Sequence, residues 1–254
     1  MQSAAIPKAD IIRAAQLCVL AQRSNPKQSC CNPGDAVRAG LAGIGLQQLE
    51  PLELNNFPLG LLSGFIAQNP HNGDLYVALS GVITWNLNPM PEFFNSVMPW
   101  KGKGLAVQAF AQTATALRDT IFYNLRRVGP RCQRLQFVGY GLGAPVAYLL
   151  HYEALEKAMQ LGFQVQVPIL FACPKFVDNT FTQWAKLSSV LSLALEGDWL
   201  PRLPTTPLNW QFEWPVVPLA IDSSFRPLLP DPPVPGETRQ LLAEDHLKAL
   251  EAVK

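Results

Sequence analysis

The chain has 254 residues, of which 48% are hydrophobic and 15% are charged, and its formal net charge is +1. This length allows one large domain with a substantial core, and the balanced charge excludes the clustered basic face typical of nucleic-acid-binding proteins. The five cysteines are an odd set without paired or metal-ligand spacing, which argues against a disulfide framework and a metal site: Cys18, Cys30, Cys31, Cys132 and Cys173.

The first residues contain no long apolar stretch after a basic start, so we expect no signal peptide and a cytoplasmic location. No segment offers the roughly 20 uninterrupted apolar residues of a membrane helix. No nucleotide or metal cofactor is implied, and the sequence carries no signal of oligomeric state.

Periodic patterns predict an order of helices and strands typical of an α/β fold. Apolar residues at helical spacing predict helices over 8–23 and 34–48, and alternating apolar segments predict an antiparallel hairpin over 61–68 and 74–81. A long amphipathic pattern over 104–127 predicts another helix. A strand over 134–139 follows, and then a helix that begins after the glycine-rich turn.

The second half continues the alternation of strands and helices, which indicates a mostly parallel sheet with helices on both faces. Buried strands are expected over 165–172 and 189–197. The stretch from Pro201 to Pro235 holds ten of the 23 prolines, so residues 201–236 are expected to form an irregular excursion. A last helical pattern covers 237–254. We expect residues 1–254 to form a single domain.

One glycine-rich turn, VGYGLGA at 138–144, admits two interpretations. It matches a loose dinucleotide-binding fingerprint, G-x-G-x-x-A, and with a serine at its centre it would be the nucleophile elbow of an α/β-hydrolase. A dinucleotide site should show an acidic residue at the end of the following strand, and here that strand ends in Ala172-Cys173-Pro174. The elbow interpretation is therefore favoured.

Six segments in order support it: Leu79-Ser80-Gly81-Val82, Val107-Gln108-Ala109-Phe110, the turn itself, Phe171 to Asn179 followed by Phe181, Gly197 to Pro204, and His246. In this order and spacing the chain resembles the class 3 lipase family, over roughly residues 60–204 and the C-terminal histidine region. The resemblance implies an α/β-hydrolase fold and a lipophilic acyl-type substrate.

Carried over position by position, the resemblance places Gly141 at the nucleophile, Asp198 at the acid and His246 at the histidine of a Ser-Asp-His triad. The backbone N–H of Leu142 would belong to the oxyanion hole. Asp198 could alternatively cap a turn. His246 could alternatively be an exposed helical residue, and a helix break at Glu244-Asp245 would be needed to bring it over the elbow.

The departures from the family pattern fall on the chemistry. Gly141 has no side chain to attack a carbonyl carbon, and Val82 stands where the family usually has a supporting hydroxyl group. Ser80 and Tyr140 replace the family's usual Arg and His and are candidate polar groups of a pocket. The triad is therefore degenerate, with an elbow that lacks its serine.

The segment over 85–100, in the family's lid region, contains large apolar residues among prolines, including Trp85, Phe93 and Phe94. Such residues can line a lipophilic pocket or cover it as a lid, although ordinary packing over the sheet edge gives the same composition. We expect them to contact a small lipophilic substrate or ligand.

Three hypotheses follow for the function. The first is non-hydrolytic general acid–base chemistry by His246 and Asp198, as in a lyase, isomerase or cyclase. The second is an ester hydrolase in which an engineered glycine has replaced the serine. The third is a non-catalytic lipase-like binding protein. Because several chemical positions differ together, natural divergence is favoured over a single engineered change.

Overall fold

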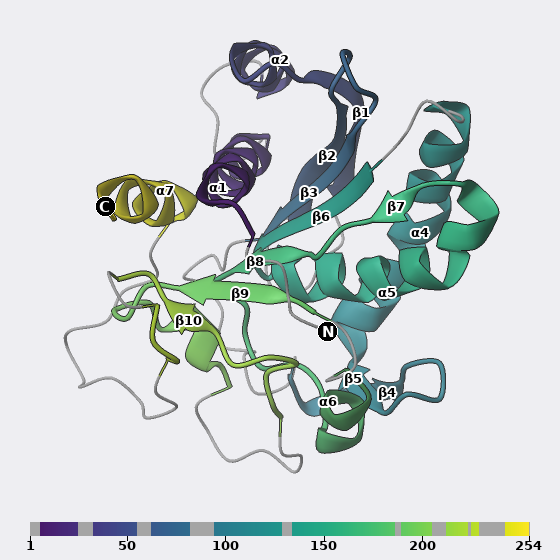
Figure 1. Cartoon of the computed structure of the whole chain (residues 1–254). Helices are drawn as coiled ribbons and strands as arrows, with labels where there is room; N and C mark the ends of the chain where they lie inside the picture. The colour runs from purple at the N-terminus through teal and green to yellow at the C-terminus, as the bar shows by residue number, and fades with distance from the viewer. Residues whose placement is uncertain are drawn as a thin grey trace.

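A central mixed β-sheet separates two layers of helices in the computed structural model of the chain (Figure 1). The structure describes residues 6–24, 33–54, 62–81, 94–128, 134–185, 189–204, 212–222, 225–228 and 242–253. In spatial order the main path of the sheet is β1 (Gln47–Leu54), β2 (Leu62–Gln68), β3 (Leu75–Gly81), β6 (Arg134–Gly141), β8 (Ile169–Phe171), β9 (Leu191–Ala194) and β10 (Leu219–Ala220). The short strand β7 (Gln164–Val165) pairs with β6, and β4 (Val97–Pro99) pairs with β5 (Leu105–Val107) in a separate ribbon.

The predicted hairpin is confirmed: β2 and β3 are antiparallel, with Leu62 opposite Gly81. Every residue of β3 is buried, as its continuous apolar pattern indicates. From β3 onward the pairs β3–β6, β6–β8, β8–β9 and β9–β10 are parallel. The carboxyl ends of β3, β6, β8 and β9 therefore meet along one edge of the sheet, where α/β folds place their ligand sites.

The predicted helix over 34–48 is wrong in its second half. Helix α2 (Pro33–Gly43) stops before Gly45, whose φ of +75° is the left-handed conformation that ends helices. The chain then enters β1, which pairs antiparallel with β2 along the edge of the sheet. The helical spacing of apolar residues extends by chance into this strand. A short apolar run does not show by itself whether a neighbouring strand is present to pair with it.

Other element boundaries differ by a few residues. The amphipathic helix α4 (Gln108–Val128) begins four residues later than predicted, because Leu105–Val107 pairs with Val97–Pro99 as a strand. The expected strand over 165–172 is divided into β7 and β8. The expected strand over 189–197 is reduced to β9, and among the described residues the final helix α7 (Ala243–Ala252) begins after the extended residue Leu242.

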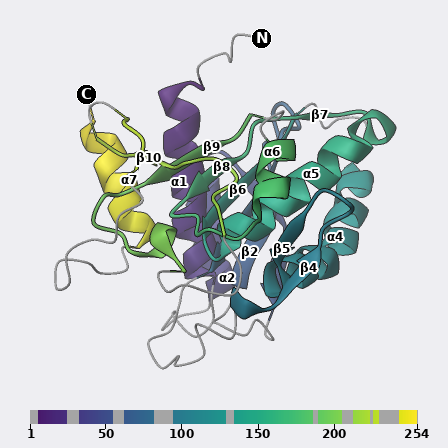
Figure 2. The same cartoon turned by 90° about the horizontal axis from the view of Figure 1, so that it is seen from below.

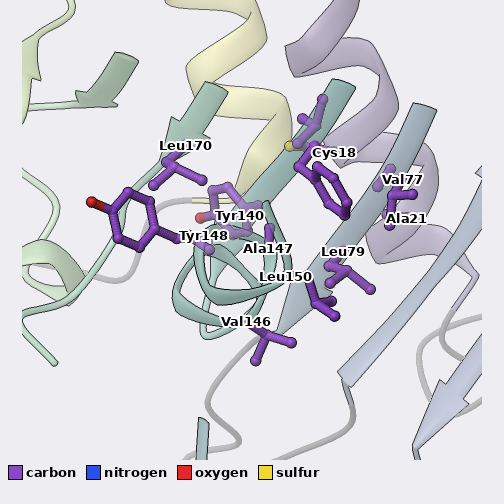
Figure 3. Packing of buried hydrophobic residues seen from close by; sticks show 14 of the residues in the cluster. Cys18, Ala21, Val77, Leu79, Tyr140, Val146, Ala147, Tyr148, Leu150 and Leu170 are labelled. Carbon is purple, nitrogen blue, oxygen red and sulfur yellow. The ribbon is translucent and has the colours of Figure 1, made fainter. Parts of the chain in front are cut away.

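Helices cover both faces of the sheet, as expected. Helices α1 (Lys8–Arg23) and α7 lie side by side on one face, and α4 and α5 (Gly143–Leu161) cover the other (Figure 2). Figure 3 shows the packing between the layers, with Cys18 and Ala21 from α1, Leu79 from β3, and Ala147 and Leu150 from α5.

The two ends of the described chain are joined through these helices. Arg23 near the end of α1 pairs with Glu244 near the start of α7 at 2.6 Å, and the Ala243 N–H donates to the Gln22 side chain. In the part of the chain that the structure describes, no helix has both the length and the apolar character needed to cross a bilayer.

Candidate functional site

The glycine-rich turn lies where two parallel strands end together. Gly141, the last residue of β6, is directly opposite Gly81, the last residue of β3. Helix α5 begins two residues after Gly141, so the turn is the strand–turn–helix arrangement that an elbow requires. Gly139 allows the close approach of helix and strand, because a Cβ there would lie 2.5 Å from Ala144 Cα.

Gly141 has a φ of +58°, in the left-handed region that side chains other than glycine adopt at a cost. A Cβ atom on Gly141 would lie only 2.4 Å from the Gly81 carbonyl oxygen and 3.0 Å from Leu200 Cδ2. The first contact involves backbone and cannot be relieved by rotating a side chain. The turn therefore has the elbow's backbone conformation but no room for a side chain.

The Gly81 carbonyl oxygen also accepts a hydrogen bond from the backbone amide that follows Gly141. The Leu142 N–H donates to the Gly81 oxygen over 2.9 Å, and Leu142 is fully buried. This N–H is the group that the sequence assigns to an oxyanion hole. In the structure it closes the end of β3 onto the start of α5 instead.

Asp198 follows β9 at the same edge of the sheet and is completely buried. Its Oδ1 accepts a hydrogen bond from the Leu200 N–H at 3.0 Å, which closes a turn at the start of the 3₁₀ helix η2 (Leu200–Arg202). Its backbone carbonyl accepts a hydrogen bond from the Arg202 guanidinium. One carboxylate oxygen of Asp198 thus caps a turn, as the alternative interpretation of this residue predicts, while the other oxygen faces a histidine.

That histidine is His246, which is 1% exposed and lies with Nε2 3.7 Å from Asp198 Oδ2. The helix break at Glu244-Asp245, which the sequence pattern indicated as necessary to bring His246 over the elbow, does not occur. Helix α7 begins at Ala243, after the extended N-cap Leu242, and runs through His246 without interruption. The packing of α7 against α1 brings His246 to Asp198 without a break.

Nδ1 of the His246 ring has a hydrogen-bond partner within the protein, whereas Nε2 is buried without one among the described residues. Nδ1 is 3.1 Å from the carbonyl oxygen of Leu242, and Nε2 faces Asp198. The ring lies edge-on to Tyr140 at 5.4 Å and to Phe171 at 6.3 Å, measured between centroids. Burial lowers the pKa of His246 to about 4, so the imidazole is neutral at pH 7.

The remaining predicted site residues divide into two groups. Ser80, Tyr140 and Leu142 lie on the strands and turn beside Gly141 and are all buried, and Ser80 Oγ has no hydrogen-bond partner in the described structure. Phe94 is buried and packs against Phe110 and Phe212, with its ring centroid 6.3 Å from each of theirs. Val82, Trp85 and Phe93 lie outside the described residues.

Two cavities in the described part of the chain are large enough for small molecules, and neither is lined by Gly141, Asp198 or His246. One, of about 310 Å³, lies at the amino-terminal end of β3 and β6 and is lined by polar groups that include Arg13, Tyr76 and Arg134. The other, of about 550 Å³, is lined mostly by apolar residues of the segment 212–217, together with Lys175 and Thr182.

Within the described ranges, no group of three or more His, Cys, Asp or Glu side chains is arranged to hold a metal ion. Cys18 and Cys173 are free and buried, and burial raises the pKa of both thiols, so neither is a thiolate at neutral pH.

Sequence reasoning missed the contribution of Gly81 and Leu200, which fill the space above the turn. Gly81 belongs to the motif Leu79-Ser80-Gly81-Val82, but its residue type does not show where its carbonyl oxygen points. Lys175 was also missed as a cavity residue. A partial signal existed for it, because it follows Pro174 at the carboxyl end of a parallel strand, where pockets form.

Comparison with known proteins agrees with a lipase-like fold. The family model described as "Lipase (class 3)" matches residues 80–208. Nonglycosylated LIP2 lipase of Yarrowia lipolytica is similar in structure, with a TM-score of 0.64 and 12% identity over 85% of this chain and 81% of that one. The mono- and diacylglycerol lipase of Aspergillus oryzae has a TM-score of 0.59 and 17% identity over 79% and 75%.

A lipase from Rhizopus microsporus var. chinensis is similar as well, with a TM-score of 0.59 and 12% identity over 80% of this chain and 70% of that one. No curated protein matches the sequence. At these identities the structural likeness shows the fold alone, and the expected α/β-hydrolase fold is confirmed.

Proposed function

The chain belongs to the class 3 lipase family, and on this premise we propose that it binds a lipophilic acyl-type ligand without hydrolysing it. In this proposal Gly141, Asp198 and His246 occupy the family's positions for the nucleophile, the acid and the histidine. The observation that carries the proposal is the position of the Gly81 carbonyl oxygen. It fills the space that the side chain of a nucleophile at position 141 would need, and it accepts the Leu142 N–H that an oxyanion would need.

The space argument concerns the nucleophile. A serine at position 141 would place its Cβ 2.4 Å from the Gly81 oxygen, in a conformation that already disfavours side chains. The surroundings of position 141 are therefore matched to glycine. This favours natural divergence over an intact hydrolase that has lost only its serine by engineering.

The hydrogen-bond argument concerns the transition state. Ester hydrolysis by this superfamily requires backbone N–H groups directed at the developing oxyanion, including that of the residue after the nucleophile. The Leu142 N–H is already donated to Gly81. Restoring the serine would thus leave the oxyanion without this donor unless the end of β3 also moved.

The lipophilic ligand is supported by family membership and by the similar structures, which are named as lipases, one of them a mono- and diacylglycerol lipase. The apolar cavity beside segment 212–217 supplies space for such a molecule. A volume of about 550 Å³ falls within the roughly 300–1,000 Å³ usual for small-molecule pockets.

A second candidate function is non-hydrolytic acid–base chemistry by His246, and the distance of 3.7 Å between His246 and Asp198 favours it. A neutral imidazole beside a carboxylate is a usable base. Against this function, Nδ1 faces a carbonyl of its own helix and the ring is 1% exposed, so neither nitrogen is directed at a described cavity.

The proposal is tested by assaying the wild-type protein and the Gly141→Ser variant on short- and medium-chain p-nitrophenyl esters. We expect no turnover above buffer from either protein. A matched control is Gly45→Ser, at a φ of +75° with nothing within 4 Å of its Cβ. Both variants carry the conformational cost of about 1–2 kcal/mol, and only Gly141→Ser adds overlap with backbone, about 1–3 kcal/mol more.

Two outcomes would overturn the proposal. Ester turnover by Gly141→Ser, with a stability equal to that of Gly45→Ser, would show that the site accepts a nucleophile. Product formed from a lipid extract by the wild type but not by His246→Gln, followed by mass spectrometry, would establish acid–base chemistry in place of binding alone.

A further inference from the structure

Lys175 is a cation in the wall of the apolar cavity and has no acidic partner among the residues that the structure describes. Lys175 lines the cavity and is partly buried, and its Nζ lies 4.7 Å from the centroid of the Trp214 ring. Among the described residues no carboxylate lies within ion-pair distance of it, although Glu213 lines the same cavity. Burial lowers the pKa of Lys175, so an anionic ligand would relieve a desolvated charge.

Apart from Lys175, Glu213 and Thr182, the residues that line the cavity are apolar. Its other lining residues include Phe212, Trp214, Pro215, Val216 and Val217, and Val217 is 46% exposed. Phe212 packs against the buried ring of Phe94, so the wall is continuous with the core. A ligand here would meet a cation at one place and mostly aliphatic and aromatic surface elsewhere.

The wall is held in place by backbone hydrogen bonds. The Phe176 N–H donates to the Glu213 oxygen at 3.2 Å, and the Glu213 N–H donates to the Val177 oxygen at 2.8 Å. The Trp214 Nε1 donates to the Pro201 oxygen at 2.7 Å, which fixes the indole beside Lys175. The cavity is therefore formed before any ligand arrives, which reduces the ordering cost of binding.

From this arrangement we propose that the cavity binds a long-chain carboxylate, with the carboxylate on Lys175 and the alkyl chain along segment 212–217. The inference rests on the proposed function, because it gives the lipophilic ligand a location and a headgroup. It differs from the elbow site, since none of Gly141, Asp198 and His246 lines this cavity.

The test is isothermal titration of the full-length protein with dodecanoate, below its micelle concentration, and with dodecanol, which has the same chain without the charge. We expect dodecanoate to bind at least about tenfold more tightly than dodecanol, as for a charge-assisted hydrogen bond in a partly buried site. Extending the carboxylate by one methylene should tighten binding about fourfold while the cavity has room.

Three variants locate the site. Lys175→Met keeps the alkyl stem and should weaken dodecanoate at least about tenfold while leaving dodecanol unchanged. Val217→Glu, at a half-exposed position that tolerates substitution, should weaken both ligands. Lys248→Met removes an exposed lysine of α7 and should change neither affinity. Thermal melts establish that each variant is folded.

The outcomes separate this inference from the proposed function. Unchanged dodecanoate binding by both Lys175→Met and Val217→Glu would overturn the assigned cavity and leave the proposed function in place. Equal affinity of the wild type for dodecanol and dodecanoate would overturn the carboxylate recognition alone. Failure of the wild type to bind either molecule would overturn the inference, and ester turnover in the preceding assay would overturn the proposed function independently.

Discussion

At the scale of single residues, the turn at Gly141 shows a backbone group filling the place of a side chain. The Gly81 oxygen stands 2.4 Å from where a Cβ would be and accepts the Leu142 N–H. Beside it, Leu200 approaches the turn with Cδ2 and donates its N–H to Asp198, whose second oxygen faces His246. These contacts form a buried circuit that holds strand ends and helix together.

His246 makes this circuit sensitive to acid. Its pKa is lowered to about 4 by burial, against about 6.5 in an unfolded chain, so between about pH 6.5 and pH 4 the unfolded state binds a proton that the folded state does not. The stabilising contribution is complete above pH 6.5 and is lost as the pH falls toward 4, by about 3 kcal/mol in total. Denaturant titrations from pH 7 to pH 4 measure it.

His246→Gln should lose correspondingly less stability over this pH range than the wild type. His151, with a pKa lowered to about 3 by burial, adds a loss of the same sign that is common to both proteins. Parallel curves for the wild type and His246→Gln would show that His246 is not the buried neutral group described above.

At the scale of elements, helix α7 depends on its packing against α1 for its place over the sheet. Ala243, His246 and Leu250 are its buried residues, spaced along one face at helical intervals. The first turn is supported by the Gln22 side chain and by the Asp245 carboxylate, which accepts the Leu242 N–H. An interruption of α7 is unnecessary because the whole helix presents this face.

Leu250→Ala tests this docking. Leu250 is 1% exposed, and removing its buried side chain should lower the free energy of unfolding by about 2–5 kcal/mol through lost transfer and a residual cavity. Lys248→Ala, on the exposed face of the same helix, should change stability by about 0.5 kcal/mol or less. Chemical denaturation of the three proteins compares them. Equal stabilities would mean that α7 contributes little to the fold.

At the scale of the whole molecule, the sheet is most protected at its centre. Strands β3 and β6 are parallel neighbours covered by α1 on one face and by α5 on the other (Figure 1). In contrast, β1 is an edge strand that pairs on one side with β2. The turn at Gly141 and the cavity of segment 212–217 are separate sites, and only the tertiary structure shows this. Local sequence patterns do not reveal how distant segments are placed relative to one another.

Amide hydrogen exchange followed by mass spectrometry should reproduce this order. Peptides from β3, β6 and the first half of α5 are expected to exchange only through global unfolding, whereas β1 and α2 open at lower free energy. Peptides from 134–150 serve as the internal reference for the most protected class. Faster exchange of β6 than of β1 would contradict the arrangement of the sheet.

The sequence by itself determined the local elements and their order: the β2–β3 hairpin, strand β6, the glycine-rich turn and helix α5 all follow from residue periodicity and turn chemistry. It also indicated Asp198 and His246 as a pair, through a resemblance. Tertiary structure decided the rest. Strand β1 required its partner β2, and His246 required α7 to dock on α1. The closure of the turn depends on where the Gly81 carbonyl oxygen lies, and no residue type encodes that position because every residue carries the same carbonyl group.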